Sequence, residues 1–298
     1  MATRFYDSCL CCGSTALTKV FACKDYTVSN EAFEVWECGT CTFRFTQNAP
    51  GESEIIRYYQ SADYVSHSDT RQGLVNRLYH TVRKFTLKSK RALVEKVTEV
   101  KTGSLLDIGA GTGAFAFAMK SAGWKVTGLE PDTTARTNAL TNYKLELEDT
   151  SRLHQLESNA FDAITMWHVL EHVHDLHGYL QTFLRILKTG GKLIIAVPNF
   201  TSYDAKVYQE FWAAYDVPRH LYHFSPRSMK VLLEKNGFVL EAVKPMWFDS
   251  FYISLLSEKY KSGRSNLVKA AFVGMLSNLK ALSDIRKCSS VIYIIRKA

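Results

Sequence analysis

Short apolar runs alternate with amphipathic stretches through the middle of the chain, between Gly103 and Pro198. The apolar runs predict strands at Ser104–Ile108, Lys125–Leu129, Ala160–Met166 and Lys192–Val197, with a weaker strand near Leu145–Leu147. Helices are predicted at Ala114–Ala122, Thr133–Asn142 and His177–Leu187. Strands and helices that alternate at this spacing form a parallel sheet with right-handed crossovers, so we predict an α/β fold.

The chain after Pro198 continues the same alternation less regularly. An aromatic stretch from Tyr203 to Phe224 comes first. A helix at Pro226–Asn236, a strand at Phe238–Val243, two further helices and a last strand at Ser290–Ile295 follow. We expect these elements to complete the sheet and its helical layers.

The first hundred residues have a different pattern. Residues 1–48 are short of apolar runs and rich in turns, with a period of two in Ala32–Cys38 that indicates a strand. Apolar residues at three- and four-residue steps across 71–100 predict a long amphipathic helix with a basic outer face. We therefore predict a module at 1–50, a linker and helix at 51–101, and a main domain at 102–298.

The basic residues are unevenly distributed along the chain. The 298 residues are 46% hydrophobic and carry a formal net charge of +8. Residues 71–101 and residues 258–298 each hold nine basic and two acidic side chains, so the whole excess of positive charge is confined to these two segments. Such segments are usually solvated helix faces, and they also suit nucleic acid or an anionic surface. No apolar run has the length of a membrane span, and the start does not resemble a signal peptide, so we expect a cytoplasmic protein.

A glycine-rich loop follows the first predicted strand of the main domain. Leu105-Leu106-Asp107-Ile108-Gly109-Ala110-Gly111-Thr112-Gly113 has the spacing G-x-G-x-G, with an aspartate two residues before the first glycine. Glycines at such a turn let a ligand approach the backbone closely. Glu130 ends the next strand, where a carboxylate can accept both hydroxyls of a ribose. No nucleotide-triphosphate loop is present in the sequence.

These motifs resemble those of class I S-adenosylmethionine-dependent methyltransferases. The resemblance rests on LLDIGAGTG, GLEP, FDAITMWHVLEH and LKTGGKLIIAVPN, in this order, over roughly residues 72–245. It implies a Rossmann-like sheet of seven strands and S-adenosylmethionine as cofactor. The residues that it implies for cofactor binding are Asp107 as support of the loop, Gly109, Ala110, Gly111 and Gly113 beside the methionine part, Glu130 on the ribose, Asp149 beside the adenine, and Trp167 and His168 at the cleft wall.

Histidines and a carboxylate cluster directly after the predicted strand Ala160–Met166. His168, Glu171 and His172 share a face if this segment is helical. A zinc protease is excluded because Val169, not Glu, follows the first histidine. The segment resembles the E-x-x-E-H element of ubiquinone-biosynthesis O-methyltransferases and small-RNA 2′-O-methyltransferases, which implies a divalent ion. His168 replaces the first acid, and imidazole favours zinc, iron or nickel over magnesium.

Three interpretations of these histidines remain open. In the first interpretation, a metal ion near His168, Glu171 and His172 lowers the pKa of a substrate hydroxyl. In the second, His172, His220 or His223 acts as a general base without metal. In the third, the residues only support the fold and shield the cofactor. The aromatic stretch around Arg219 predicts a substrate lid near residues 200–225, with ordinary core packing as the alternative.

The seven cysteines include two C-x-x-C pairs. Cys9 with Cys12 and Cys38 with Cys41 predict one structural zinc, and Cys11 is left out because Gly13 follows Cys12. A redox dithiol and a metal-free module are the alternatives. The other thiols are expected to be free, as in a reducing compartment. Similar four-cysteine modules precede the cofactor fold in certain sugar C-methyltransferases.

We therefore expect methyl transfer from S-adenosylmethionine to an oxygen of a small metabolite. C-methylation of a nucleotide-linked sugar and methylation of RNA are the alternatives, and nucleic acid is accordingly a second candidate partner. A cofactor-binding fold that serves only as an interaction module is a non-enzymatic alternative. The sequence does not indicate the oligomeric state.

Overall fold

The chain is described by a computed structural model at residues 3–60 and 74–298, with side chains of the first helix described from residue 82. These residues form two compact units. The first comprises residues 3–60, 170–176 and 196–293, and the second comprises residues 74–169, 177–195 and 294–298. The predicted boundaries at residues 50 and 101 stay predictions. Residues 71–73, the start of the predicted long helix, lie outside the described residues.

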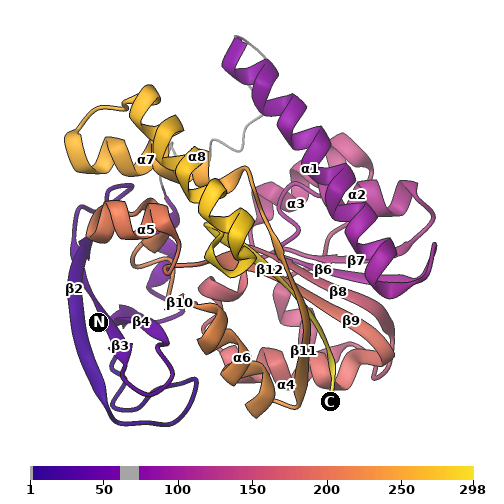
Figure 1. Cartoon of the computed structure of the whole chain (residues 1–298). Helices are drawn as coiled ribbons and strands as arrows, with labels where there is room; N and C mark the ends of the chain where they lie inside the picture. The colour runs from indigo at the N-terminus through magenta and orange to yellow at the C-terminus, as the bar shows by residue number, and fades with distance from the viewer. Residues whose placement is uncertain (1–2, 61–73) are drawn as a thin grey trace. The chain divides into compact units, whose positions relative to one another are not determined.

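A six-stranded sheet forms the centre of the fold, with the strand order β11-β12-β9-β8-β6-β7 (Figure 1). Its strands are β6 (Ser104–Ile108), β7 (Lys125–Leu129), β8 (Phe161–Trp167), β9 (Leu187–Pro198), β11 (Phe238–Pro245) and β12 (Ser290–Lys297). Strand β6 pairs in parallel with β7 and β8, so that Leu106 lies opposite Thr127 and Ile164. Leu106 and Ile164 are fully buried. The predicted α/β fold is confirmed.

The expected seventh strand is absent from the described residues, which corrects the strand count. The segment near Leu145–Leu147 forms one parallel bridge, between Leu129 and Glu148. The chain leaves the preceding helix through Lys144 in the left-handed conformation, with φ of 52°. It enters a 3₁₀ turn capped by Asp149 soon afterwards. Of the four residues between these two turns, only Glu148 pairs with β7, so the segment forms a single bridge and no strand.

Helices flank the strands of the second unit in the predicted order. They are α1 (Leu74–Thr98), α2 (Ala114–Ser121), α3 (Thr133–Tyr143), the 3₁₀ turn η2 (Thr150–Gln155) and α4 (Leu176–Ile186), whose first residue belongs to the first unit. Asp132 caps α3 by accepting a hydrogen bond from the backbone N–H of Ala135 at 2.6 Å. Helix α1 confirms the predicted amphipathic helix from residue 74 onward.

The first unit contains a second sheet, with the strand order β10-β4-β3-β2. Its strands are β2 (Leu17–Lys24), β3 (Ala32–Cys38), β4 (Arg44–Gln47) and β10 (Tyr222–His223), and a separate pair joins β1 (Thr3–Arg4) to β5 (Ala49–Pro50). Phe45 lies opposite Trp36 on one side and Tyr222 on the other. This register carries His223 and its neighbours onto the N-terminal sheet.

Aromatic side chains fill the core of the first unit. Its helices and 3₁₀ turns are η1 (Ile55–Tyr59), η3 (Leu170–His172), α5 (Tyr203–Tyr208), η4 (Gln209–Phe211), η5 (Ala213–Tyr215), α6 (Pro226–Lys235), α7 (Asp249–Ser262), α8 (Leu267–Ser283) and η6 (Ile285–Lys287). Tyr208, Trp212 and Tyr215 pack with Val35 and Tyr58 in one buried cluster. The aromatic stretch therefore supplies core packing, and its role as a lid stays a prediction.

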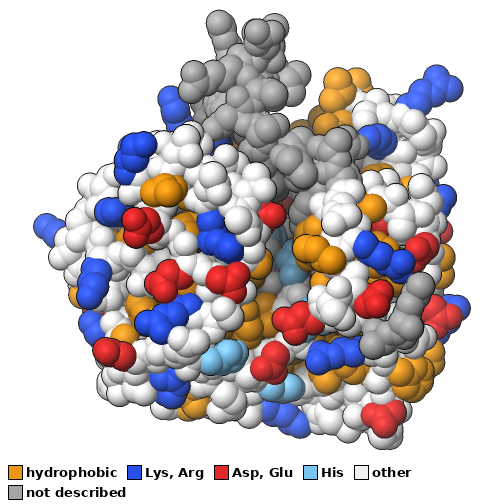
Figure 2. Space-filling model, turned by 180° about the vertical axis from the view of Figure 1, so that it is seen from behind, with side chains coloured by type: hydrophobic (Ala, Val, Ile, Leu, Met, Phe, Trp, Pro, Cys, Tyr) orange, Lys and Arg blue, Asp and Glu red, His pale blue; other side chains and the backbone are white. Residues whose placement is uncertain are grey.

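None of the helices in the described ranges is long and apolar enough to cross a membrane. The face drawn in Figure 2 carries Lys and Arg side chains interspersed with Asp and Glu. Mixed charge of this kind does not single out a nucleic-acid surface on that face.

Candidate functional site

The glycine loop lies between β6 and α2, as the sequence predicts. Gly109, Gly111 and Gly113 have positive φ values of 67°, 54° and 79°. This backbone region favours glycine because a Cβ is strained there. A Cβ on Gly109 would lie 2.3 Å from the side chain of Val169, whereas a Cβ on Gly111 would meet nothing within 4 Å. The loop is thus packed at its first glycine and open at its second.

Glu130 connects the end of β7 to this loop. Its Oε2 accepts a hydrogen bond from the backbone N–H of Gly111 at 2.8 Å, and its Oε1 accepts one from Asp132 at 3.0 Å. Burial raises the pKa of Glu130, and the two N–H donors counter part of that rise. Each carboxylate oxygen retains a lone pair, so Glu130 can accept further hydrogen bonds from a ligand.

Asp107 lies near the end of β6, two residues before the first glycine of the loop. It is 1% exposed, and its Oδ1 accepts a hydrogen bond from the Thr165 hydroxyl at 2.7 Å. Burial raises the pKa of Asp107 to about 7, against the effects of Thr165 and Lys90. The side chain is held by β8 and is not open to solvent.

The remaining predicted cofactor residues lie at strand ends of the same unit. Asp149 caps η2, accepts a hydrogen bond from the Ser151 N–H at 3.0 Å, and has a side chain that is 51% exposed. Trp167 ends β8 with the Lys90 ammonium 4.3 Å from its ring centroid. Its buried indole N–H has no partner among the described atoms. His168 follows with φ of 59°, so the segment does not continue as a helix.

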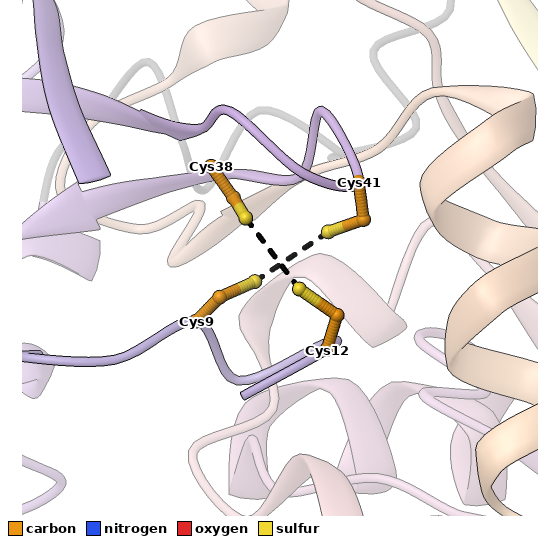
Figure 3. A group of neighbouring side chains, drawn as sticks. All are labelled: Cys9, Cys12, Cys38 and Cys41. Atoms are coloured by element: carbon orange, nitrogen blue, oxygen red, sulfur yellow. Dashed lines mark hydrogen bonds between the residues drawn. The ribbon is translucent and has the colours of Figure 1, made fainter. Parts of the chain in front are cut away.

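The four predicted metal-binding cysteines converge in the first unit (Figure 3). Cys9 Sγ lies 3.5 Å from Cys41 Sγ, and Cys12 Sγ lies 3.5 Å from Cys38 Sγ. Sulfurs around a tetrahedral zinc are about 3.8 Å apart, because each Zn–S bond is about 2.3 Å. The cluster therefore fits a zinc ion in both donor type and spacing.

The cysteines outside this cluster are buried free thiols. The Cys11 thiol donates to the backbone carbonyl of Ser228 at 3.2 Å, which places it outside the group of four. Cys23 and Cys288 are 2% and 0% exposed. Burial raises the pKa of both of these thiols. Their free, buried state agrees with the prediction.

A second group of potential ligands consists of Glu171, His172 and His220. One ligand atom from each lies within 4.8 Å of the others. The two imidazole rings are perpendicular, with centroids 4.5 Å apart. Glu171 and His172 come from the turn η3, and His220 follows η5. The structure thus groups Glu171 and His172 with His220 instead of His168, because positive φ at His168 breaks the predicted helical face.

Backbone carbonyls fix the orientation of both imidazoles. His172 Nδ1 lies 3.0 Å from the carbonyl oxygen of Arg219, and His220 Nδ1 lies 2.9 Å from that of Ala214. A carbonyl can only accept, so each Nδ1 carries a proton, and in the neutral ring Nε2 then presents a lone pair. Metal-binding histidines and histidine bases commonly have this arrangement. Burial and the neighbouring His220 lower the pKa of His172 to about 4.

A buried ion network supports this group. Arg219, 1% exposed, donates to Asp216 at 2.6 Å and to Asp25 at 3.0 Å. Burial alone would raise the pKa of Asp216, but the Arg219 guanidinium lowers it below its usual range. Asp216 Oδ2 also lies 3.9 Å from His220 Nε2. The network holds the backbone of Arg219, which positions His172.

His223, the third predicted catalytic histidine, lies in strand β10 and not in the Glu171–His172–His220 group. Its Nε2 lies 3.2 Å from the Thr46 hydroxyl, and it is 4% exposed. Burial, with the charges of His220 and Arg44, lowers the pKa of His223 well below its usual range. This environment indicates a packing role.

Sequence reasoning missed Asp25 and Tyr59. Tyr59 Oη lies 3.0 Å from His172 Nδ1, and Asp25 pairs with Arg219. Both come from the N-terminal segment, more than a hundred residues before their partners. The only local signal was the polar turn after Asp25, whose carboxylate accepts backbone hydrogen bonds from Thr27 and Ser29.

Comparisons with known proteins identify relatives that share part of this sequence. The human mitochondrial ubiquinone biosynthesis O-methyltransferase is 29% identical over 163 residues, which cover 49% of this chain and 44% of that protein. The ubiquinone biosynthesis O-methyltransferase of Xanthomonas oryzae pv. oryzae (strain PXO99A) is 29% identical over 161 residues, covering 49% of this chain and 66% of that protein. The match thus spans less than two thirds of either relative.

Structure and family comparisons extend the likeness to the fold. The magnesium protoporphyrin IX methyltransferase of Synechocystis PCC 6803, solved with bound SAH, superposes with a TM-score of 0.53 at 14% identity. The superposition covers 82% of this chain and 99% of that protein, and it shows a shared fold. The family model described as "Methyltransferase domain" matches residues 79–243, more than half of the chain. The chain therefore belongs to the methyltransferase-domain family, as the resemblance predicts.

Proposed function

We propose that the protein transfers a methyl group from S-adenosylmethionine to a hydroxyl oxygen of a small metabolite. The observation that carries this proposal is the Glu171–His172–His220 group. Both of its imidazoles donate Nδ1–H to backbone carbonyls, and one ligand atom of each ring lies within 4.8 Å of one of the buried Glu171 carboxylate. The names of the relatives, O-methyltransferases of ubiquinone biosynthesis, support oxygen as the acceptor atom.

The loop residues fit the cofactor. S-adenosylmethionine supplies, when bound, a methyl group made electrophilic by its sulfonium. The open side of Gly111 lets a ligand approach the backbone, and Glu130 has free lone pairs for the ribose hydroxyls. We assign the adenine side to Asp149 and the cleft wall to Trp167, with His168 after it.

The Glu171–His172–His220 group, which we assign to the methyl acceptor, begins shortly after a residue that contacts the glycine loop. Val169 packs on Gly109 of the loop, and Glu171 comes two residues later. Two peptide units span at most about 7 Å, so the connection keeps Glu171 close to Val169. Orientation of an acceptor beside the methyl donor accounts for a large part of the rate in such transfers.

Glu171, His172 and His220 can hold a divalent ion, which would lower the pKa of an acceptor hydroxyl. Two imidazoles and one carboxylate suit zinc, iron or nickel. The competing assignment is a histidine of this group that accepts the acceptor proton directly at Nε2. In both assignments the carbonyls of Arg219 and Ala214 hold the rings in place.

The N-terminal cluster of Cys9, Cys12, Cys38 and Cys41 is proposed to bind one structural zinc. Its four thiols are brought together by two C-x-x-C turns, and a segment of this size has little core of its own. A cytoplasmic location, expected from the free thiols, stays a prediction.

The test is methyl transfer from isotope-labelled S-adenosylmethionine into a metabolite extract of the native host. We expect a labelled O-methyl product, identified by mass spectrometry, that is absent with Glu130→Ala. A chelator added after purification separates the metal-assisted reaction from the metal-free one. A C-methylated nucleotide sugar or labelled RNA as the product would contradict O-methylation of a small metabolite.

A further inference from the structure

The helical hairpin of α7 and α8 has an unusual distribution of side chains. The two helices lie side by side (Figure 1). Helix α8 buries a face of mostly small residues, which are Ala270, Val273, Gly274, Ser277 and Ala281. Its opposite face exposes large apolar residues, among them Val268 at 82% and Leu282 at 69%. A surface helix normally has the reverse arrangement, with its large apolar residues inside.

The exposed residues form one continuous stripe. Its members recur at steps of four and three residues and are Val268, Phe272, Met275, Leu279 and Leu282. At 3.6 residues per turn they fall within an arc of about 80° and extend over about 21 Å. Single exposed apolar residues are ordinary on a protein surface, but a contiguous stripe of this length marks an interaction site.

Positive charge surrounds this α8 stripe. Residues 249–293 contain seven Lys and Arg against three acids. The cations are exposed and are Lys259, Lys261, Arg264, Lys269, Lys280, Arg286 and Lys287. Glu258 is 2% exposed beneath Lys269, and Asp284 is half-buried beside Arg286. Asp249, at the start of α7, is also half-buried, so no acidic side chain of 249–293 is fully exposed.

The cations lie at both ends of the stripe. Arg264 and Lys269 are next to its first residues, and Lys280, Arg286 and Lys287 are next to its last. A partner that covers the stripe must therefore be apolar in the middle and anionic at the borders. A second copy of this hairpin would place like charges together, and nucleic acid would leave the apolar stripe in water.

We propose that the α8 stripe binds the surface of a bilayer that contains acidic phospholipids. The apolar side chains enter the boundary between headgroups and acyl chains, and the bordering Lys and Arg contact the lipid phosphates. This attachment is peripheral, and it does not depend on which methyl acceptor the protein uses. It accounts for seven of the nine basic side chains in residues 258–298.

The test is sedimentation of the full chain with lipid vesicles. We expect binding to vesicles that mix phosphatidylglycerol with phosphatidylcholine, and little binding to phosphatidylcholine alone. The double variant Phe272→Ser, Leu279→Ser should weaken binding at least about tenfold, because each large apolar side chain contributes to insertion. Lys280→Gln and Lys287→Gln should each weaken it about fivefold.

The matched control is Leu140→Ser, an apolar residue of α3 that is 48% exposed, and it should bind like wild type. Thermal unfolding of each variant checks that the fold is retained. Equal binding to both vesicle types, or unchanged binding by the Phe272→Ser, Leu279→Ser variant, would overturn the proposal. So would a dimer in solution that this variant dissociates, because the stripe would then belong to a second copy.

Discussion

Arg219 Nη2 lies 3.0 Å from Asp25 Oδ1, although 194 residues separate the two in the chain. Their side chains are 1% and 0% exposed. The carbonyl oxygen of the same arginine accepts the Nδ1 hydrogen bond that orients His172. The N-terminal module therefore contributes a residue that positions the proposed catalytic group, in addition to its cysteine cluster.

Asp25→Asn should destabilise the protein substantially. The change leaves the buried Arg219 with Asp216 as its remaining carboxylate partner, and breaking a buried ion pair costs about 3–5 kcal/mol. The free energy of unfolding, measured by urea denaturation, checks this. As a matched control, Glu34→Gln breaks the exposed pair with Lys19 and should cost under about 1 kcal/mol. Equal stabilities of Asp25→Asn and wild type would contradict a structural role of the pair.

The same pair predicts a pH dependence. Burial opposes ionisation, but backbone N–H groups and Arg219 lower the pKa of Asp25 below its usual value. A lowered carboxyl pKa stabilises the fold above the unfolded pKa of about 3.9, and this stabilisation is lost as the pH falls through the folded pKa. The stability difference between wild type and Asp25→Asn should therefore be constant from neutral pH to about 5 and narrow below about 4. A stability difference that grows as the pH falls would show that folding raises the pKa of Asp25 instead of lowering it.

Cys38→Ser should release the zinc that we propose for the N-terminal module. Removal of one of four thiolates leaves an incomplete tetrahedral site, and binding energy of such sites is folding energy. Elemental analysis should find about one zinc per wild-type chain and a large loss in the variant. Cys11→Ser is the matched control and should keep its zinc, because the Cys11 thiol bonds to the Ser228 carbonyl. A wild-type protein that is metal-free and fully folded would be inconsistent with the site.

His220→Gln should weaken binding of a divalent ion at the Glu171–His172–His220 group at least about tenfold, since a ligand is lost. Calorimetric titration with Ni²⁺, on protein that retains its structural zinc, measures the effect. His223→Gln should bind like wild type because its Nε2 faces the Thr46 hydroxyl. Indistinguishable titrations of His220→Gln and wild type would favour a histidine base without metal.

Local sequence patterns predicted much of the second unit. Strands β6 and β7 have the predicted bounds, and the loop glycines and Glu130 occupy the predicted strand ends. Periodicity and turn residues determine such elements over a few neighbouring positions. The spacing of the two C-x-x-C pairs likewise predicted the sulfur cluster, since each pair forms its own tight turn.

Contacts between segments far apart in the chain could not be predicted from local sequence patterns. The pairing of His172 with His220 depends on the turn at Arg219 and on β10 joining β4. The assignment of His168 to this group assumed a helix, which the left-handed backbone at His168 prevents. The prediction of a seventh strand was wrong for a comparable reason, because the segment after the left-handed Lys144 forms one bridge, at Glu148, and no strand.

Binding of S-adenosylmethionine, measured by isothermal titration calorimetry, tests the central claim most directly. Wild type should bind at a single site, and Glu130→Ala should bind about 10–100-fold more weakly, since hydrogen bonds to a carboxylate contribute about 1.5–3 kcal/mol. Glu157→Ala, at an exposed position away from the loop, should bind like wild type. Absence of binding by wild type, or equal affinities of wild type and Glu130→Ala, would contradict the account.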